Sequence, residues 1–277
     1  PTRRSSDLGL AFTSCPTAAI VVANVSTDVQ IGNTNSASDI VSIFSGSKGI
    51  KVDGDNAVIQ NTVFGVNLSN AAAGQSGNSI DVSSFASNVT IDSVTSKNAT
   101  TPNINIDTVS TVSITDSLIA DSTSNSIRLL SVTNATMSGN TITNAGGVFI
   151  SGGSSFVITN NTITNTSTNG TYRAFTFAGS VSDVQLGAAS STNIATDGNV
   201  MSVAASPVIS AGAAILTNFQ AAFNLSFQSS NTNYLSYDSG MEPFTVPSSL
   251  VATTTSIAGT AGVSSGTVSA YQNGVFV

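Results

Sequence analysis

The chain has very few ionisable or metal-binding side chains. Its 277 residues include no His, no Trp, one Cys and seven Lys and Arg residues together, and the net charge is −7. Nucleic-acid binding is not expected, because a protein needs Lys and Arg to neutralise phosphates. A single cysteine, Cys15, excludes an internal disulfide. With no His in the chain, a structural zinc site is excluded as well.

Charged residues make up 8% of the chain, compared with roughly 25% in ordinary soluble domains. Apolar residues make up 40%, which is enough for a sizeable core. No run approaches the roughly 20 apolar residues of a membrane span. Ser, Thr, Asn and Gly take the place of charges. These short neutral side chains suit stacked strands, on which neighbouring like charges would repel one another.

The first eight residues have an unusual sequence. Residues 1–8 read Pro-Thr-Arg-Arg-Ser-Ser-Asp-Leu, and the chain does not begin with Met. This segment resembles a translated sequencing adapter, which implies a metagenomic fragment without its own N-terminus. We therefore leave residues 1–8 out of the predicted fold and expect them to be unpaired.

The strongest signal is an internal repeat of short alternating strands. Two segments, 137–144 and 158–165, nearly superpose 21 residues apart, and Ile114 and Ile91 begin the same frame at intervals of 23 residues. Each of these follows an earlier alternating pair of apolar residues. The earlier pairs are Ile80/Val82, Ile104/Ile106, Ile127/Leu129 and Val148/Ile150, and a further pair, Phe175/Phe177, begins the next repeat.

Alternation with period two is typical of strands with one buried face. A repeat of about 21 to 32 residues with three short strands is one coil of a solenoid, and each coil must stack on the next to bury its apolar side. Stacking places equivalent residues of successive coils roughly 4.8 Å apart. The sequence predicts an all-β parallel β-helix of about seven coils over residues 20–195. The apolar residues of its strands should form one buried column.

The segment Asn160-Asn-Thr-Ile-Thr-Asn165 resembles the repeat of right-handed parallel β-helix proteins of the pectin-lyase-like fold. This resemblance covers about two thirds of the chain. It implies an internal ladder of Asn amides that includes Asn140 and Asn161, with Ser117 before them. The alternative is that these are solvent-exposed turn residues. The fold carries many activities, so the resemblance does not specify a function.

The composition changes after about residue 206. We assign residues 9–206 to the β-helix and residues 207–277 to a C-terminal cap or an additional β-rich region, because a solenoid needs its last coil covered. The local pattern is ambiguous. Ile215, Phe219, Ala222 and Phe223 have helical spacing, whereas Phe223, Leu225 and Phe227 alternate as a strand would.

The candidate ligand-binding residues lie at outward positions of successive coils. Lys51, Asp81, Asn105 and Arg128 share one phase, and Phe149 follows in line. They could pair as charges on a solvated face, they could hold a sugar, or Arg128 could act as the base of a lyase beside Asp81. We predict no catalytic residues, metal ligands or cofactor.

Hydrolases of this fold carry paired Asp residues, a Gly-His-Gly segment and an Asn-Thr-Asp segment, none of which this chain contains. We therefore expect a secreted or cell-surface structural or adhesive β-helix that binds a polysaccharide or cell-surface glycan weakly. One alternative is a polysaccharide-active lyase or hydrolase with atypical or missing catalytic residues. Another is an ice-binding or surface-binding solenoid with flat Thr rows, although regular Thr-x-Thr columns are not evident.

Overall fold

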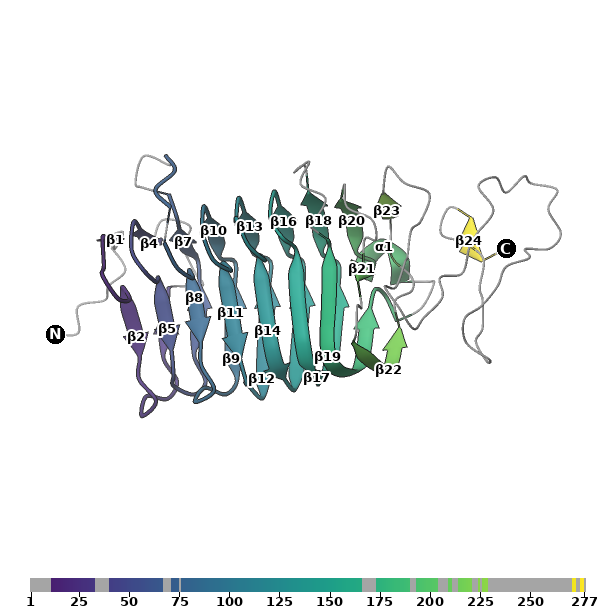
Figure 1. Ribbon diagram of the computed structural model, residues 1–277, viewed down its shortest axis with the longest axis horizontal. Helices are drawn as coiled ribbons and strands as arrows, with labels where there is room; N and C mark the ends of the chain where they lie inside the picture. The colour runs from purple at the N-terminus through teal and green to yellow at the C-terminus, as the bar shows by residue number, and fades with distance from the viewer. Residues whose placement is uncertain are drawn as a thin grey trace.

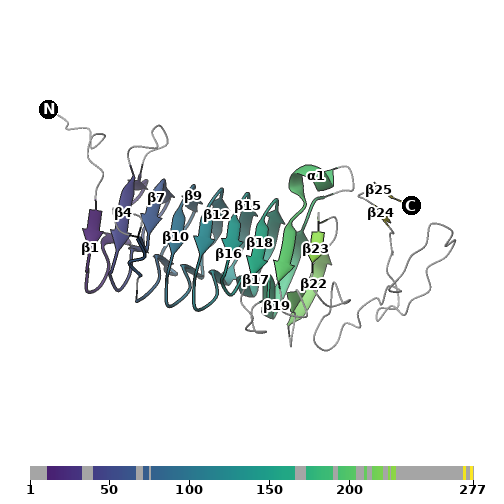
Figure 2. The same ribbon diagram turned by 90° about the horizontal axis from the view of Figure 1, so that it is seen from above.

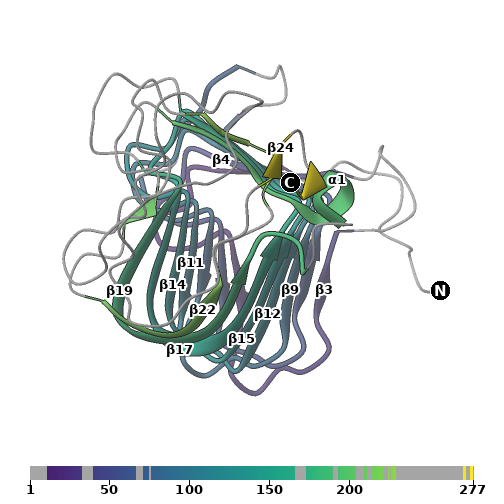
Figure 3. The ribbon, with the colours of Figure 1, turned by 90° about the vertical axis from the view of Figure 1, so that its right-hand side faces the viewer.

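The computed structural model describes residues 11–32, 40–66, 71–74, 76–165, 173–189, 193–203, 209–210, 214–220, 224, 226–228, 271–272 and 275–276. The chain winds into an elongated stack of coils, and each coil adds one strand to each of three faces (Figures 1 and 3). The strands of neighbouring coils pair in parallel. The predicted right-handed parallel β-helix is therefore confirmed.

Face 1 is a nine-stranded parallel sheet whose strands follow one another along the long axis (Figure 2). Its strands are β1 (Ala11–Thr13), β4 (Val41–Phe44), β7 (Thr62–Phe64), β10 (Thr95–Lys97), β13 (Leu118–Ala120), β16 (Thr141–Thr143), β18 (Thr162–Asn165), β20 (Val200–Val203) and β23 (Ser226–Gln228).

Faces 2 and 3 join into one 14-stranded sheet, because two long strands, β17 (Val148–Thr159) and β19 (Phe175–Leu186), run through both. Face 2 contains β2 (Ile20–Val22), β5 (Ile50–Val52), β8 (Ile80–Val82), β11 (Ile104–Asp107), β14 (Ile127–Val132), the first halves of β17 and β19, and β21 (Ile209–Ser210). Face 3 contains β3 (Gln30–Ile31), β6 (Val58–Gln60), β9 (Val89–Asp92), β12 (Thr111–Thr115), β15 (Asn134–Ser138), the second halves of β17 and β19, and β22 (Ile215–Gln220).

Three smaller elements complete the described chain. The short helix α1 (Ile194–Asp197) precedes β20, and β24 (Tyr271–Gln272) pairs with β25 (Val275–Phe276) in a separate antiparallel sheet. Within the described ranges, no helix is both long and apolar enough to cross a membrane.

The core is a continuous column of aliphatic side chains enclosed by the three faces. In the coil that contains β11, β12 and β13, the inward residues Ile104, Ile106, Val112, Ile114 and Ile119 are at most 1% exposed. The predicted inward positions of the other coils are equally buried. They include Ile80, Val82, Ile91, Ile127, Leu129, Met137, Val148, Ile150 and Ile158. Period-two alternation therefore gave the correct side of each strand.

Turn residues in the left-handed backbone region explain why Asn, Asp, Ser and Gly are so abundant. The residue directly after each of six face 1 strands has a positive φ: Ser14, Ser45, Gly65, Asn98, Asp121 and Asn144. Asn, Asp and Gly tolerate this conformation better than most residues. At Gly65 a side chain would also clash, because a Cβ atom there would lie 1.7 Å from the carbonyl oxygen of Lys97.

A buried Asn ladder crosses the turn between face 3 and face 1. The Nδ2 atoms of Asn140, Asn161 and Asn199 donate to the Oδ1 atoms of the next Asn in the stack at 2.9, 3.0 and 2.9 Å, so that within the described residues the ladder extends to Asn224. Each Oδ1 also accepts the backbone N–H of the preceding rung, beginning with that of Ser117 at 3.1 Å. The internal ladder, rather than the exposed-turn alternative, is confirmed.

The stack is longer than the sequence predicted. Face 1 runs from Ala11 to Gln228, whereas we expected about seven coils over residues 20–195. Past residue 206 the described chain continues the stack in β21, β22 and β23. Ile215–Gln220 is a strand, so helical spacing is the wrong prediction there. Ala222, Phe223, Leu225 and residues 1–8 lie outside the described residues.

Replacing Asn161 with Ala tests the ladder. Asn161 is 1% exposed, and it donates to the backbone oxygens of Met137 and Thr159 while it links Asn140 to Asn199. Each buried polar group that loses its partner costs about 1–3 kcal/mol. We expect urea denaturation to show a loss of about 3 kcal/mol or more for Asn161→Ala. The exposed Asn134 provides the control, and Asn134→Ala should cost less than about 1 kcal/mol. Equal losses would contradict a buried ladder.

Candidate functional site

The five candidate residues form one outward column on face 2. Lys51 pairs with Asp81, Asp81 with Asn105, Asn105 with Arg128, and Arg128 with Phe149 in the parallel register. All five are partly exposed, while the residues on either side of each point into the core. Neighbours in the column are therefore separated by about 4.8 Å. The predicted common column is confirmed, and its role in binding stays a prediction.

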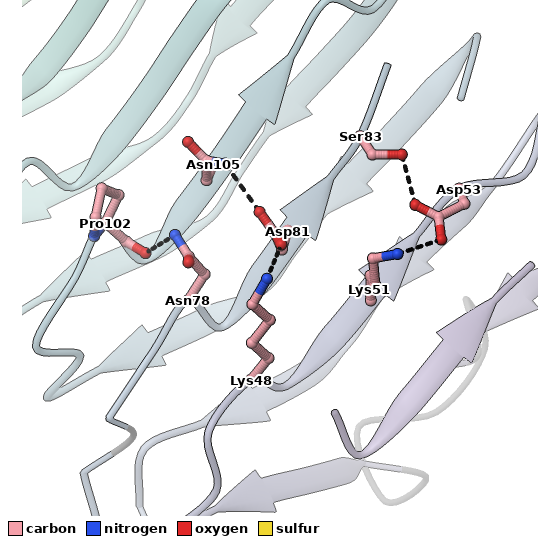
Figure 4. Close-up of polar contacts among 8 residues, drawn as sticks. All are labelled: Lys48, Lys51, Asp53, Asn78, Asp81, Ser83, Pro102 and Asn105. Carbon is pink, nitrogen blue, oxygen red and sulfur yellow. Dashed lines mark hydrogen bonds and ion pairs between the residues drawn. The ribbon is translucent and has the colours of Figure 1, made fainter. Parts of the chain in front are cut away.

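The first two residues of the column are held by ion pairs with other residues (Figure 4). Lys51 Nζ lies 2.5 Å from an Asp53 carboxylate oxygen, and Ser83 Oγ donates to the other oxygen at 2.5 Å. Lys48 pairs with Asp81, whose second carboxylate oxygen accepts from Asn105 Nδ2 at 2.8 Å.

Sequence analysis missed Lys48, Asp53 and Ser83 as part of this network. Asp53 could have been found, because it lies two residues after Lys51 on the same side of the chain. Ser83 follows Asp81 at the same interval. Lys48 gave no such signal, because it lies before the strand that carries Lys51 and its partner Asp81 belongs to the next coil.

The Asp53 carboxyl has a pKa below its ordinary value of 3.8. Burial alone would raise this pKa. Hydrogen bonds from Lys51 and Ser83, together with the positive charges of Lys51 and Lys48, more than offset that effect and lower it. Asp53 therefore remains a charged partner of Lys51 under ordinary conditions and is not poised to exchange a proton.

The other end of the column is open to new contacts. The guanidinium of Arg128 makes no hydrogen bond or ion pair with any residue that the structure describes. Beside it, Asn105 Oδ1 is buried and has no hydrogen-bond partner among the described residues. On the other side lies the partly exposed ring of Phe149. One unpaired cation thus lies between an unsatisfied acceptor and an aromatic ring.

The column does not present an acid–base pair. Asp81 is bound to Lys48 and Asn105, and it lies two coils, or about 10 Å, from Arg128. Asp53, Asp81 and Asp107 lie on three different coils. Among the described residues, no group of three or more His, Cys, Asp or Glu side chains is close enough to hold a metal ion. The arrangement can donate and accept hydrogen bonds and pack against an apolar surface.

Face 1 presents a small threonine array. Thr141 and Thr143 of β16 lie in register with Thr162 and Thr164 of β18. The flanking strands place Leu118 and Ala120 on one side, and Val200 and Ser202 on the other. The array is therefore two strands wide, and it does not form the long Thr-x-Thr rows that would support a surface-binding solenoid.

Comparison with known proteins identifies the fold independently. A family model described as "Right handed beta helix region" matches residues 82–235, which include Asn105, Arg128 and Phe149. No curated protein and no solved structure matches the chain.

The pKa of Asp53 leads to a prediction about pH. Its folded pKa is lower than the ordinary value of 3.8, which we take for the unfolded chain. Its stabilising contribution is therefore complete above the unfolded value and is lost as the pH falls through the folded one. Lys51→Gln should lower the free energy of unfolding in urea by no more than about 1 kcal/mol near neutral pH, because this pair is partly exposed. The difference from wild type should shrink as the pH falls below the unfolded value and through the lowered folded pKa of Asp53. A difference that does not depend on pH would contradict this account.

Proposed function

Because the chain belongs to the right-handed β-helix family, we propose that it is a secreted or cell-surface β-helix with a structural and adhesive role. It binds glycans weakly through face 2, at the end of the column formed by Asn105, Arg128 and Phe149. Lys51 and Asp81 flank this site as an ion-paired polar border.

The unpaired Arg128 between Asn105 and Phe149 is the observation that carries the proposal. A guanidinium has five N–H donors for the oxygens of a sugar. The Phe149 ring offers an apolar surface to the C–H face of a pyranose. Ligand sites commonly combine such an apolar surface with a few polar groups that fix orientation.

Asn105 supplies the complementary acceptor. Its Nδ2 is committed to Asp81, which fixes the direction of the amide and leaves Oδ1 with no described donor. A buried polar atom without a partner costs free energy. A sugar hydroxyl that entered beside the flexible Arg128 side chain would recover part of this cost by donating to Oδ1.

The solenoid also suits weak adhesion to a polymer. The column runs along the long axis of the stack, so an extended glycan could lie along it and contact several coils. Individually weak contacts on one polymer reinforce one another through high effective concentration. A rigid elongated scaffold holds these contacts at fixed spacing, which is appropriate for a surface protein.

A glycan array probed with the purified chain tests this function. We expect binding to a subset of glycans, and we expect Arg128→Ala to weaken it about tenfold or more, since hydrogen bonds to charged groups contribute about 1.5–3 kcal/mol. Phe149→Ala should have a similar effect. Ser113→Ala, an outward substitution on face 3 of the same coil as Asn105, should leave binding unchanged.

Two outcomes would contradict the proposal. One is that no glycan on the array loses binding with either Arg128→Ala or Phe149→Ala. The other is turnover. The chain should be incubated with pectin and alginate, with and without calcium, while unsaturated products and reducing ends are followed. Turnover that disappears in Arg128→Ala would establish the lyase alternative.

A further inference from the structure

A groove on face 3 lies apart from the face 2 column. It has a volume of about 540 Å³ and crosses β15, β17, β19 and β22. Four adjacent strands extend over about 14 Å along the stack. Volumes of roughly 300–1,000 Å³ are typical of sites for small ligands, and this groove is open to solvent, as suits a ligand that lies along a surface. Nothing in the proposed function uses this groove.

One rim of the groove is a polar row. Ser155, Asp183 and Asn218 lie next to one another in the register, and all three have left-handed backbone conformations, with φ of 62°, 55° and 50°. Asn218 Nδ2 donates to one Asp183 carboxylate oxygen at 2.8 Å, and Ser182 Oγ donates to the other at 3.0 Å. These two hydrogen bonds, the one from Asn218 foremost, lower the pKa of Asp183 despite a small opposing effect of desolvation.

The opposite side of the groove presents a different surface. Thr136, Val157 and Gln185 occupy one outward column of β15, β17 and β19. Val157 is 40% exposed, although it is a large apolar side chain. Gln185 Nε2 donates to the backbone oxygen of Gly187 at 3.1 Å, which orients the amide and leaves its oxygen available as an acceptor.

We propose that this groove is a second binding site, which takes a short neutral oligosaccharide. The hydroxyl and amide groups of Thr136, Ser155, Gln185 and Asn218 offer both donors and acceptors, and Val157 offers a small apolar surface for the C–H groups of a sugar ring. This combination matches a ligand that is dense in hydroxyl groups and carries no charge.

The composition of the lining argues against other ligands. Among the described residues that line the groove there is no Lys or Arg, and the ionised Asp183 would repel an anion. A bound cation would need several carboxylates, whereas the described residues of the lining include one acid, Asp183. An extended peptide usually binds a sheet by pairing with a free strand edge. Here the backbone groups of β17 and β19 already pair with neighbouring strands on both sides.

Isothermal titration calorimetry with cellohexaose, xylohexaose and mannohexaose as separate probes tests this site. We expect at least one of them to bind, and hexagalacturonate not to bind at the groove. Val157→Arg fills the groove and should weaken binding of the neutral probe at least tenfold. Gln185→Ala removes an amide without adding bulk and should weaken the same binding, which keeps the test valid if Val157→Arg misfolds.

Thr90→Arg is the matched control, because Thr90 belongs to the same outward column as Thr136 but lies two coils outside the groove. It should leave binding unchanged. Arg128→Ala should also leave binding of the neutral probe unchanged, because Arg128 lies on face 2. This variant therefore distinguishes a failure of the groove proposal from a failure of the proposed function. The inference is overturned if none of the neutral probes binds. It is also overturned if the Val157→Arg and Thr90→Arg variants bind the neutral probe equally well, or if Arg128→Ala abolishes binding of that probe.

Discussion

The whole structure depends on the in-register stacking of coils. A three-residue strand cannot bury its apolar side chains alone, so each coil is stable only between its neighbours. Stacking aligns the equivalent residues of successive coils. A residue type that fits at one position therefore recurs in a column along the stack. Inside the stack this gives aliphatic columns and the Asn140–Asn161–Asn199–Asn224 ladder. At the turns it gives rows of residues with positive φ. The low charge content follows from the same constraint, because like charges in a column repel.

Register also determines what the surface can bind. A shift of one residue in any strand would turn its outward residues into the core, so the register that aligns the ladder also places Arg128 between Asn105 and Phe149. Where opposite charges lie near one another, as at Lys51 and Asp53 or Lys48 and Asp81, they pair and leave a neutral border. Where a charge has no described counterpart, as at Arg128, its donors stay available for the ligand contacts that we propose. Each face offers such columns independently, so one solenoid can carry separate sites on faces 2 and 3.

The sequence predicted the parts of the fold that repeat. Residues equivalent to Ile104, Ile106 and Ile114 recur in neighbouring coils at nearly constant spacing. Their burial and register could therefore be predicted from the sequence. Asn199 and Asn224 were missed because they follow Asn161 and Asn199 by 38 and 25 residues, rather than by the 21 residues that separate Asn140 from Asn161. The groove could not be predicted, because its lining comes from four strands and from the path of β17 and β19 across two faces. The ion pair of Lys48 with Asp81 joins a turn to a strand of the next coil, so the repeat pattern of the sequence does not indicate it.

The most direct test of the account is amide hydrogen exchange measured by NMR at the ladder turn. The backbone N–H groups of Ser117, Asn140, Asn161 and Asn199 each donate to a side-chain Oδ1 of the following rung. Turn amides usually exchange through local fluctuations that require little free energy, whereas amides locked in a cooperative core exchange only through global unfolding. The account predicts that these four amides exchange as slowly as those of the central strands β12 and β15. Exchange at rates typical of exposed turns would contradict a ladder that holds the coils in register.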